Sequence, residues 1–340
     1  MIPLLLGLAL QAGMAPEGGG VLVAASRYGG EIVVMDAATL EVRSRHDAAQ
    51  GVNDVEIIPG SQTVISPHFG RFRDRDPETG AGAGWGAVDS LGYFTIDLAT
   101  GESILRPLEN CARPHGADID PAGQRLWVTC EVDGSIIEIA LDTGSVIARH
   151  RLGEGVHKVM LMPDGETLAA SNPGTGEAYF IDPDGTVTTI HVGNGAEALA
   201  ASSDAGRLWV AAGGEARFCA INLPERAIAF CHETQGRFPI ALAEDPVRNV
   251  VWVARLMEHD LAAISIETGE VEQVIALGGF VLGMALDAEN RRLYATLPGL
   301  DAIVMHDADT GERLAITRGI PDGDDIDLSP RTPATGPDDT

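Results

Sequence analysis

Basic side chains are scarce in this sequence of 340 residues. Lys158 is its only lysine, and 23 lysines and arginines stand against 50 aspartates and glutamates, which gives a formal net charge of −27. A surface this acidic repels phosphate backbones and anionic lipid headgroups. The composition therefore argues against a nucleic-acid partner and against a polybasic contact with a membrane.

Long apolar runs are scarce as well. Beyond the amino terminus no stretch approaches the roughly 20 residues of a membrane span, so we expect no such span. Residues 1–15 form an apolar run with the length of a signal-peptide core, and Gly13 and Ala15 are small enough for cleavage. No basic residue precedes the run and Pro16 would follow the cut, so a short buried or frayed segment is the alternative. We predict a signal peptide and a periplasmic or secreted protein.

Glycine and proline, in contrast, occur 41 and 19 times and punctuate a repeated phrase. In Gln124–Leu152, three short β-branched runs are separated by Asp-Gly and Asp-Thr-Gly turns, and a fourth run follows Gly155. Residues with the same place in the fourth type of run recur at intervals of 62, 42, 40, 43, 42 and 42. A four-stranded repeat of ~40–45 residues is typical of propeller blades, and seven such positions predict seven blades.

The two ends of the chain are expected to share one blade. Three strands are expected near the amino terminus, at Val21–Ala25, Glu31–Met35 and Glu41–Arg45. The missing fourth strand is supplied by Asp324–Leu328, and this pairing closes the ring and removes the exposed edges of an open array. We therefore predict an all-β fold with one seven-bladed propeller over 16–330, a flexible tail over 331–340, and a monomer.

Several phrases of the repeat resemble those of the YVTN or YncE-like seven-bladed propellers. They are Leu126-Trp-Val-Thr, Leu293-Tyr-Ala-Thr, Asp142-Thr-Gly, Asp309-Thr-Gly and the Pro-His-Gly that follows Arg113. The resemblance extends over nearly the whole chain after the first 15 residues, and it implies the fold rather than an activity. Lactonase, nitrous oxide reductase and amine dehydrogenase propellers among the relatives imply that this scaffold can also carry chemistry.

The cofactor motifs of such relatives are missing from the sequence. Segments after Thr-Gly, such as Gly101-Glu-Ser-Ile, lack the repeated tryptophan of quinoproteins, so we expect no PQQ. Covalent haem c needs Cys-x-x-Cys-His, and Cys111-Ala-Arg-Pro-His115 lacks the second cysteine. A copper cluster of many histidines is not expected either, and no phosphate loop for a nucleotide is present.

The first residues of the innermost strands are expected to form a ring around one mouth of the central channel. In blade order, beginning with the shared blade, this ring consists of Asp324, Asn53, His115, His157, Glu197, Ile240 and Leu282. Five consecutive polar groups beside two aliphatic ones suit a pocket that orients an asymmetric ligand. We therefore predict a ligand site at this mouth; the alternative is that these residues have structural roles.

A divalent transition metal is a further hypothesis for the same mouth. His115, His157 and Glu197 are of types that bind zinc, iron or copper, and His68, at the end of a second strand, is a candidate fourth ligand. The alternative is that Pro-His-Gly is a habit of the repeat and only caps a strand start. The remaining histidines are expected in solvated positions: His46, His150, His191, His232, His259 and His306.

One repeat is longer than the others. Aligning Ser66–Gly70 with Thr129–Asp133 assigns the excess to residues 71–90, an insertion between second and third strands that lies on the same mouth. Glycines within it would allow the movement of a lid.

The insertion also concentrates cations in a chain that has few. Arg71 and Arg73 lie in it with Trp85, and Arg113 precedes the first ring histidine. Arginine binds carboxylates bidentately, and tryptophan can cover an apolar part of a ligand. This pattern predicts a small anionic ligand; the alternative is a solvated loop whose arginines pair with neighbouring acids.

Four cysteines are placed in two local pairs. Cys219 and Cys231 lie at similar distances from a hairpin turn, and Cys111 and Cys130 are both expected at the ring mouth. Two disulfides are what an exported protein would contain. Buried thiols in a cytosolic protein are the alternative.

The sequence leaves the function open between classes. The first hypothesis is a non-catalytic exported propeller that binds a small anionic molecule or a protein at the polar mouth. The second is an enzyme, either a lactonase-like hydrolase or a metal-dependent oxidoreductase, with His115, His157 or Glu197 as general base. No Gly-x-Ser-x-Gly elbow or His-Glu-x-x-His motif supports nucleophilic or zinc-protease chemistry. A surface or adhesion module is the third.

Overall fold

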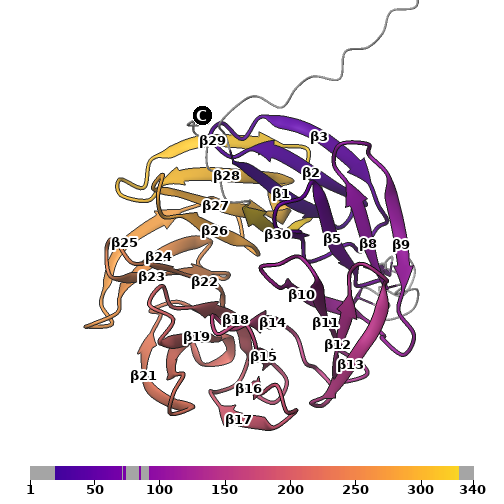
Figure 1. The fold of residues 1–340 in the computed structure, drawn as a ribbon. Helices are drawn as coiled ribbons and strands as arrows, with labels where there is room; N and C mark the ends of the chain where they lie inside the picture. Colours follow the sequence, from indigo (N-terminus) through magenta and orange to yellow (C-terminus); the bar gives the residue numbers. More distant parts are fainter. Residues whose placement is uncertain (1–19, 71, 74–83, 86–91, 329–340) are drawn as a thin grey trace, which may run out of the picture.

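Seven four-stranded antiparallel sheets are arranged in a ring around a central channel (Figure 1). This computed structural model describes residues 20–70, 72–73, 84–85 and 92–328. Each sheet is one blade, and its first strand lies nearest the channel. The predicted seven-bladed all-β propeller is therefore confirmed.

Each blade follows the chain from the channel outward. Blade 1 contains β4 (Glu56–Ile57), β5 (Thr63–His68), β8 (Gly92–Asp97) and β9 (Ser103–Pro107). Blade 2 contains β10 (Pro114–Ile119), β11 (Arg125–Cys130), β12 (Ser135–Ala140) and β13 (Ser145–Arg151). Blade 3 contains β14 (Val159–Leu161), β15 (Leu168–Asn172), β16 (Glu177–Ile181) and β17 (Val187–His191). Blade 4 contains β18 (Ala196–Ala201), β19 (Arg207–Ala212), β20 (Arg217–Asn222) and β21 (Ala227–Glu233). Blade 5 contains β22 (Pro239–Asp245), β23 (Val250–Arg255), β24 (Asp260–Ser265) and β25 (Val271–Ala276). Blade 6 contains β26 (Met284–Asp287), β27 (Arg292–Leu297), β28 (Ala302–Asp307) and β29 (Arg313–Arg318).

Blade 7 joins the two ends of the described chain. Its strands are β30 (Gly323–Leu328), β1 (Val21–Ser26), β2 (Glu31–Asp36) and β3 (Val42–Asp47). Leu22 of β1 pairs with Leu328, and Ala24 pairs with Ile326, so the yellow β30 lies beside the indigo β1 in Figure 1. The predicted closure of the ring is confirmed.

Among the described residues, four short elements lie outside the blades. β6 (Phe72–Arg73) pairs with β7 (Gly84–Trp85) within the insertion between β5 and β8. Short 3-10 turns η1 (Gly213–Glu215) and η2 (Pro298–Leu300) follow the second strands of blades 4 and 6. Among the described residues, no helix is long and apolar enough to cross a membrane. The predicted segments 1–15 and 331–340 lie outside the described residues.

Aspartate turns explain how successive strands reverse direction. Asp97 Oδ1 accepts hydrogen bonds from the backbone N–H groups of Ala99 and Thr100, both at 2.8 Å. Gly101 closes this turn with a φ of +77°, a conformation that a side chain would strain. Many of the acidic side chains thus serve turn geometry.

The core consists mainly of the second and third strands of each blade. Trp127, Trp209, Trp252 and Tyr294 all lie on second strands and are at most 2% exposed. Burial of one such side chain contributes about 2–3 kcal/mol. The outermost strands are more exposed, and no residue of β13 or β29 is fully buried.

Strand direction separates the connecting loops into two faces. The mouth face contains the loops before each innermost strand and those between second and third strands, including the insertion. The far face contains the remaining turns. Both predicted disulfides are present: Cys111–Cys130 lies on the mouth face, and Cys219–Cys231 joins directly opposite residues of β20 and β21.

Two histidines differ from the sequence prediction. His46 on β3 is 6% exposed and His306 on β28 is 4% exposed, so neither is solvated. Burial lowers the pKa of both imidazoles. A place on one of the two outer strands of a blade therefore does not by itself expose a histidine to solvent.

Candidate functional site

An imidazole held between two carboxylates forms the centre of the mouth. His157 Nδ1 lies 2.6 Å from Glu131 Oε1, and His157 Nε2 lies 2.8 Å from Glu197 Oε1. His157 precedes β14, Glu197 lies on β18, and Glu131 follows β11. Three successive blades therefore meet at one side chain.

The electrostatics of this contact fix the charge of His157. Burial lowers the pKa of His157, but the charge of Glu197 and the hydrogen bonds to both carboxylates outweigh it and raise the pKa to about 9. Burial raises the pKa of Glu197, yet the charge of His157 makes the net direction downward. His157 is thus an imidazolium at neutral pH, and both of its N–H groups donate.

His115 stacks on this imidazolium but has the opposite charge preference. The two rings are 4.0 Å apart between centroids and inclined by 26°. Burial lowers the pKa of His115 well below its usual value, and the nearby positive charges of His157 and Lys158 act in the same direction. His115 is therefore neutral, and its buried Nδ1 atom has no hydrogen-bond partner among the residues that the structure describes.

Asn53 is the second group at the mouth with unmet hydrogen-bonding capacity. It holds the ring position of blade 1 and is completely buried. Neither its amide nitrogen nor its amide oxygen has a partner within the described part of the chain. Most buried polar groups are paired, and leaving one unpaired costs about 1–3 kcal/mol. Asn53 and His115 thus present orphaned groups on neighbouring blades.

A second layer of residues fixes Glu131. Arg113 Nη2 lies 3.1 Å from Glu131 Oε2, and the Arg113 guanidinium lies 4.4 Å from the centre of the Phe69 ring. Phe69 in turn contacts the His115 ring edge-on at 5.0 Å. The Cys111–Cys130 disulfide ties together the two segments that carry Arg113 and Glu131.

His68 does not join the histidine and glutamate cluster. His68 and Cys130 hold the same place at the end of their second strands, and Phe69 corresponds to Glu131. The sequence alignment of Ser66–Gly70 with Thr129–Asp133 made His68 equivalent to Glu131, and it was therefore wrong by one residue. A one-residue slip reverses the face on which a side chain lies, and His68 Nε2 instead lies 2.8 Å from the Gln50 carbonyl oxygen.

Glu131 is the functional candidate that the sequence analysis missed. The sequence feature that could have identified Glu131 is its position directly after a second strand that ends beside the ring. Correct alignment of blades 1 and 2 would have required the length of the insertion to be known to one residue.

Asp324 is part of a separate ion-pair group. It is the first residue of the polar half-ring, the name we give to the five consecutive polar ring residues Asp324, Asn53, His115, His157 and Glu197. Arg27 Nη1 lies 3.1 Å from Asp324 Oδ1, and Arg27 Nη2 lies 2.9 Å from Asp322 Oδ1. Burial raises the pKa of Asp324, and the Arg27 charge opposes this effect. These ion pairs therefore link the segment that follows β1 to the start of β30, within blade 7.

Acidic side chains also connect the innermost strands below the ring. Each of three aspartates accepts a hydrogen bond from a backbone N–H of the next blade at 2.5–3.1 Å. The acceptor and donor pairs are Asp54 with Ala117, Asp118 with Leu161, and Asp327 with Ile57. These carboxylates satisfy backbone donors of strands that have no further strand on the channel side.

Lys158 is the cation of this lower group. Its ammonium pairs with Asp54, and Asp325 Oδ2 lies 4.0 Å away. Burial raises the pKa of Asp325 to about 7, although the charge of Lys158 acts in the opposite direction. Lys158 of blade 3 therefore forms a salt bridge with Asp54 of blade 1.

The donor atoms at the mouth suit a metal in type and spacing but not in orientation. One ligand atom each from His115, Glu131 and His157 lies within 4.8 Å of the others. A histidine nitrogen binds a metal in the plane of its ring, and the two ring planes are stacked 4.0 Å apart with an inclination of 26°. An ion shared by both histidines would require one ring to rotate and His157 to lose its proton.

Three predicted ligand residues lie outside the described residues in whole or in their side chains. Arg71 is one of them, and of Arg73 and Trp85 only the backbone pairing of β6 with β7 is described. The predicted anion contacts of the insertion therefore stay a prediction.

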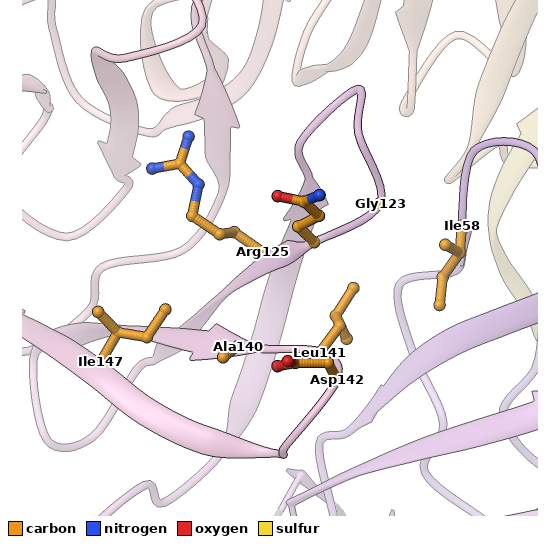
Figure 2. A pocket seen from close by; sticks show the side chains of 8 residues that line it. Ile58, Gly123, Arg125, Ala140, Leu141, Asp142 and Ile147 are labelled. Carbon is orange, nitrogen blue, oxygen red and sulfur yellow. The ribbon is translucent and has the colours of Figure 1, made fainter.

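A separate cavity of about 570 Å³ opens on the far face (Figure 2). Ile58 of blade 1 and Arg125, Leu141 and Ile147 of blade 2 line it. It contains none of the predicted ring residues, so it lies apart from the histidine and glutamate cluster.

Comparisons with known proteins identify the fold only. No family model matches this chain, and no curated protein matches it in sequence. A protein of unknown function from Desulfotomaculum acetoxidans superposes with a TM-score of 0.70 at 13% identity, covering 92% of this chain and 99% of that chain.

Two solved enzymes are similar in the same way. The periplasmic gluconolactonase PpgL of Pseudomonas aeruginosa gives a TM-score of 0.68 at 14% identity, covering 92% of this chain and 99% of that chain. The dihydro-heme d1 dehydrogenase NirN gives 0.64 at 12% identity, covering 90% of this chain and 74% of that chain. The resemblance to YVTN or YncE-like propellers thus stays a prediction at the level of the family.

Proposed function

We propose that this propeller is an extracytoplasmic protein that binds a small molecule at the polar mouth of its channel. The observation that carries the proposal is the pair of buried polar groups, the Asn53 amide and His115 Nδ1, that have no hydrogen-bond partner among the described residues, beside a His157 that is bound to both Glu131 and Glu197. A ligand that hydrogen-bonds to them recovers the free energy that their burial costs. The two disulfides support a location outside the cytoplasm.

The ligand's charge follows from the insertion rather than from the described mouth. Arg27, Arg113 and His157 are each already paired with carboxylates. We propose that Arg71 and Arg73 balance the charge of a carboxylate, and that the Asn53 amide and the neutral His115 ring donate hydrogen bonds to its oxygens. A protein side chain of similar chemistry is the alternative occupant.

Two buried asparagines on the mouth face allow a matched test of binding. Asn172 is as buried as Asn53, but its amide bonds to the Glu154 carbonyl and to the Gly174 N–H. We expect Asn53→Ala to weaken binding of gluconate at least tenfold in calorimetry without lowering the melting temperature. Asn172→Ala should lower the melting temperature and leave binding intact. A stability loss in Asn53→Ala with unchanged gluconate affinity would contradict the proposal.

A second candidate function, hydrolysis of a lactone, is favoured by the stacked histidines. His115 is held neutral and His157 is held protonated, the arrangement of a general base beside a general acid. His115 would take a proton from water as it attacks the lactone carbonyl carbon. The ring C–O bond then breaks, and His157 gives its proton to the leaving alkoxide, so the product is a hydroxy acid.

Proton release from glucono-δ-lactone tests this activity. We expect His115→Ala to reduce kcat/KM by about 10²-fold or more, whereas His191→Ala, which removes an exposed histidine of β17, should have no effect. Hydrolysis no faster than in buffer would reject the lactonase candidate. Metal analysis of the same preparation tests the oxidoreductase alternative, which a transition-metal content below about a tenth of an equivalent would eliminate.

A further inference from the structure

Exposed large apolar side chains gather on one part of the mouth face, whereas Tyr28 of blade 7 and Val132 of blade 2 are exposed singly on other loops of this face. Phe238 is 52% exposed, Met257 46%, Leu300 39% and Phe280 37%. All four belong to mouth-face loops of blades 5 and 6, and we call them the apolar shelf. Contiguous exposed apolar groups of this kind mark binding surfaces.

The shelf is a packed surface. A Cβ atom added to Gly299 would lie 2.7 Å from the Phe280 ring, and one added to Gly279 would lie 3.1 Å from Leu300. The Phe280 ring also lies 6.5 Å from the His259 ring of blade 5, between centroids. Loops of the two blades therefore form one surface.

The shelf continues into the ring of the channel mouth. Phe238 and Phe280 precede the two aliphatic ring residues, Ile240 and Leu282, by two positions each. Both aliphatic residues are half-buried, and β22, which contains Ile240, packs beside β18, which contains Glu197. The ring residues thus change from polar to aliphatic between Glu197 of blade 4 and Ile240 of blade 5, although the innermost strands of these blades pack side by side.

We propose that the ligand of the mouth is amphipathic: an alkyl-chain carboxylate whose polar end binds in the polar half-ring and whose chain lies over Ile240, Leu282 and the apolar shelf. This inference rests on the proposed binding function and specifies its ligand class. A chain that covers the shelf removes apolar surface of both partners from water, and each buried methylene strengthens binding about threefold. A protein partner would need only the shelf, whereas an amphipathic molecule uses the shelf and the orphaned polar groups together.

Titration of the full chain with butyrate, hexanoate, octanoate and decanoate by calorimetry tests the inference. We expect Kd to fall about threefold per methylene. The double variant Phe238→Ser/Phe280→Ser should flatten this dependence and weaken decanoate binding at least tenfold. Val247→Ser is the matched control, because Val247 is 70% exposed on the far face, and it should leave the series unchanged.

The outcomes separate this inference from the function on which it rests. Binding that requires Asn53 but does not change from butyrate to decanoate would overturn the inference and leave the binding function intact. Absence of any carboxylate binding would overturn both. Decanoate binding that survives Asn53→Ala would show a surface independent of the polar half-ring, and a dimer in sedimentation that Phe238→Ser/Phe280→Ser dissociates would assign the shelf to a protein interface. Either result would overturn the inference.

Discussion

Two arcs of the same ring use equivalent backbone positions for different chemistry. In blades 7 and 1 to 4, the mouth positions hold polar groups, and ion pairs bind some of them, as His157 is bound to Glu131 and Glu197. In blades 5 and 6, the same positions hold Ile240 and Leu282 beneath exposed aromatic rings. The propeller therefore supplies the positions, and each blade's side chain selects the interaction.

The largest loss of stability should follow from replacing Lys158, the lysine of the polar arc, with an apolar residue like those of the apolar arc. Lys158 occupies the place of Ala241 and Gly283 in blades 5 and 6. Lys158→Met leaves Asp54, whose side chain is 3% exposed, without its cation. We expect a loss of about 3–5 kcal/mol in the free energy of unfolding, measured by urea denaturation.

A surface ion pair provides the control for this loss. Arg217 pairs with Glu215 at 2.8 Å, but both side chains are about a third exposed. Arg217→Met should cost less than about 1 kcal/mol. Equal losses in the two variants would mean that burial does not distinguish the polar arc.

The two disulfides provide a second comparison, between the mouth and an outer hairpin. Cys111→Ala/Cys130→Ala and Cys219→Ala/Cys231→Ala should each lower the free energy of unfolding by about 3 kcal/mol. Only the first should also weaken gluconate binding, because Cys111 and Cys130 hold the segments of Arg113 and Glu131. Equal binding by both double variants would separate the polar arc from its disulfide.

A pH series should sharpen the role of the lower carboxylates. Asp325 faces Asp54 and Asp324 as well as Lys158, and its pKa is raised by burial to about 7. Because the folded state resists ionisation, wild-type stability is reduced as pH rises from about 4 to 7. Asp325→Asn should therefore match wild type near pH 4 and exceed it by about 1–3 kcal/mol at pH 8 in urea denaturation. A difference that does not change with pH would contradict this assignment.

The smallest effect should come from extending the polar arc by one blade. Ile240→Asn places an amide next to Glu197's blade at a half-buried position, and we expect it to cost about 1 kcal/mol in stability. Decanoate binding should weaken about tenfold, while butyrate binding should change less than twofold. If butyrate and decanoate weaken equally, Ile240 does not belong to the chain-binding side.

The repeat made the fold predictable because it is encoded locally. Asp-Gly and Asp-Thr-Gly turns recur along the repeat, so strand number, closure by Asp324–Leu328 and the proximity of the cysteines in each pair follow from spacing, whereas their oxidation did not. The approach of His115, His157 and Glu197 also followed from their equivalent positions. The register around His68 did not, because the insertion interrupts the turn that aligns the other blades.

The sequence by itself determined the number of blades, the order of polar and aliphatic groups around the ring and the sulfur pairs, since each depends on periodic spacing. Only the tertiary structure decided which charges meet. His157 lies between Glu131 and Glu197, Lys158 pairs with Asp54, and the Asn53 amide has no partner in the described part of the chain. Such contacts join different blades, and side-chain direction and burial in three dimensions determine them. Periodicity along the chain does not contain this information.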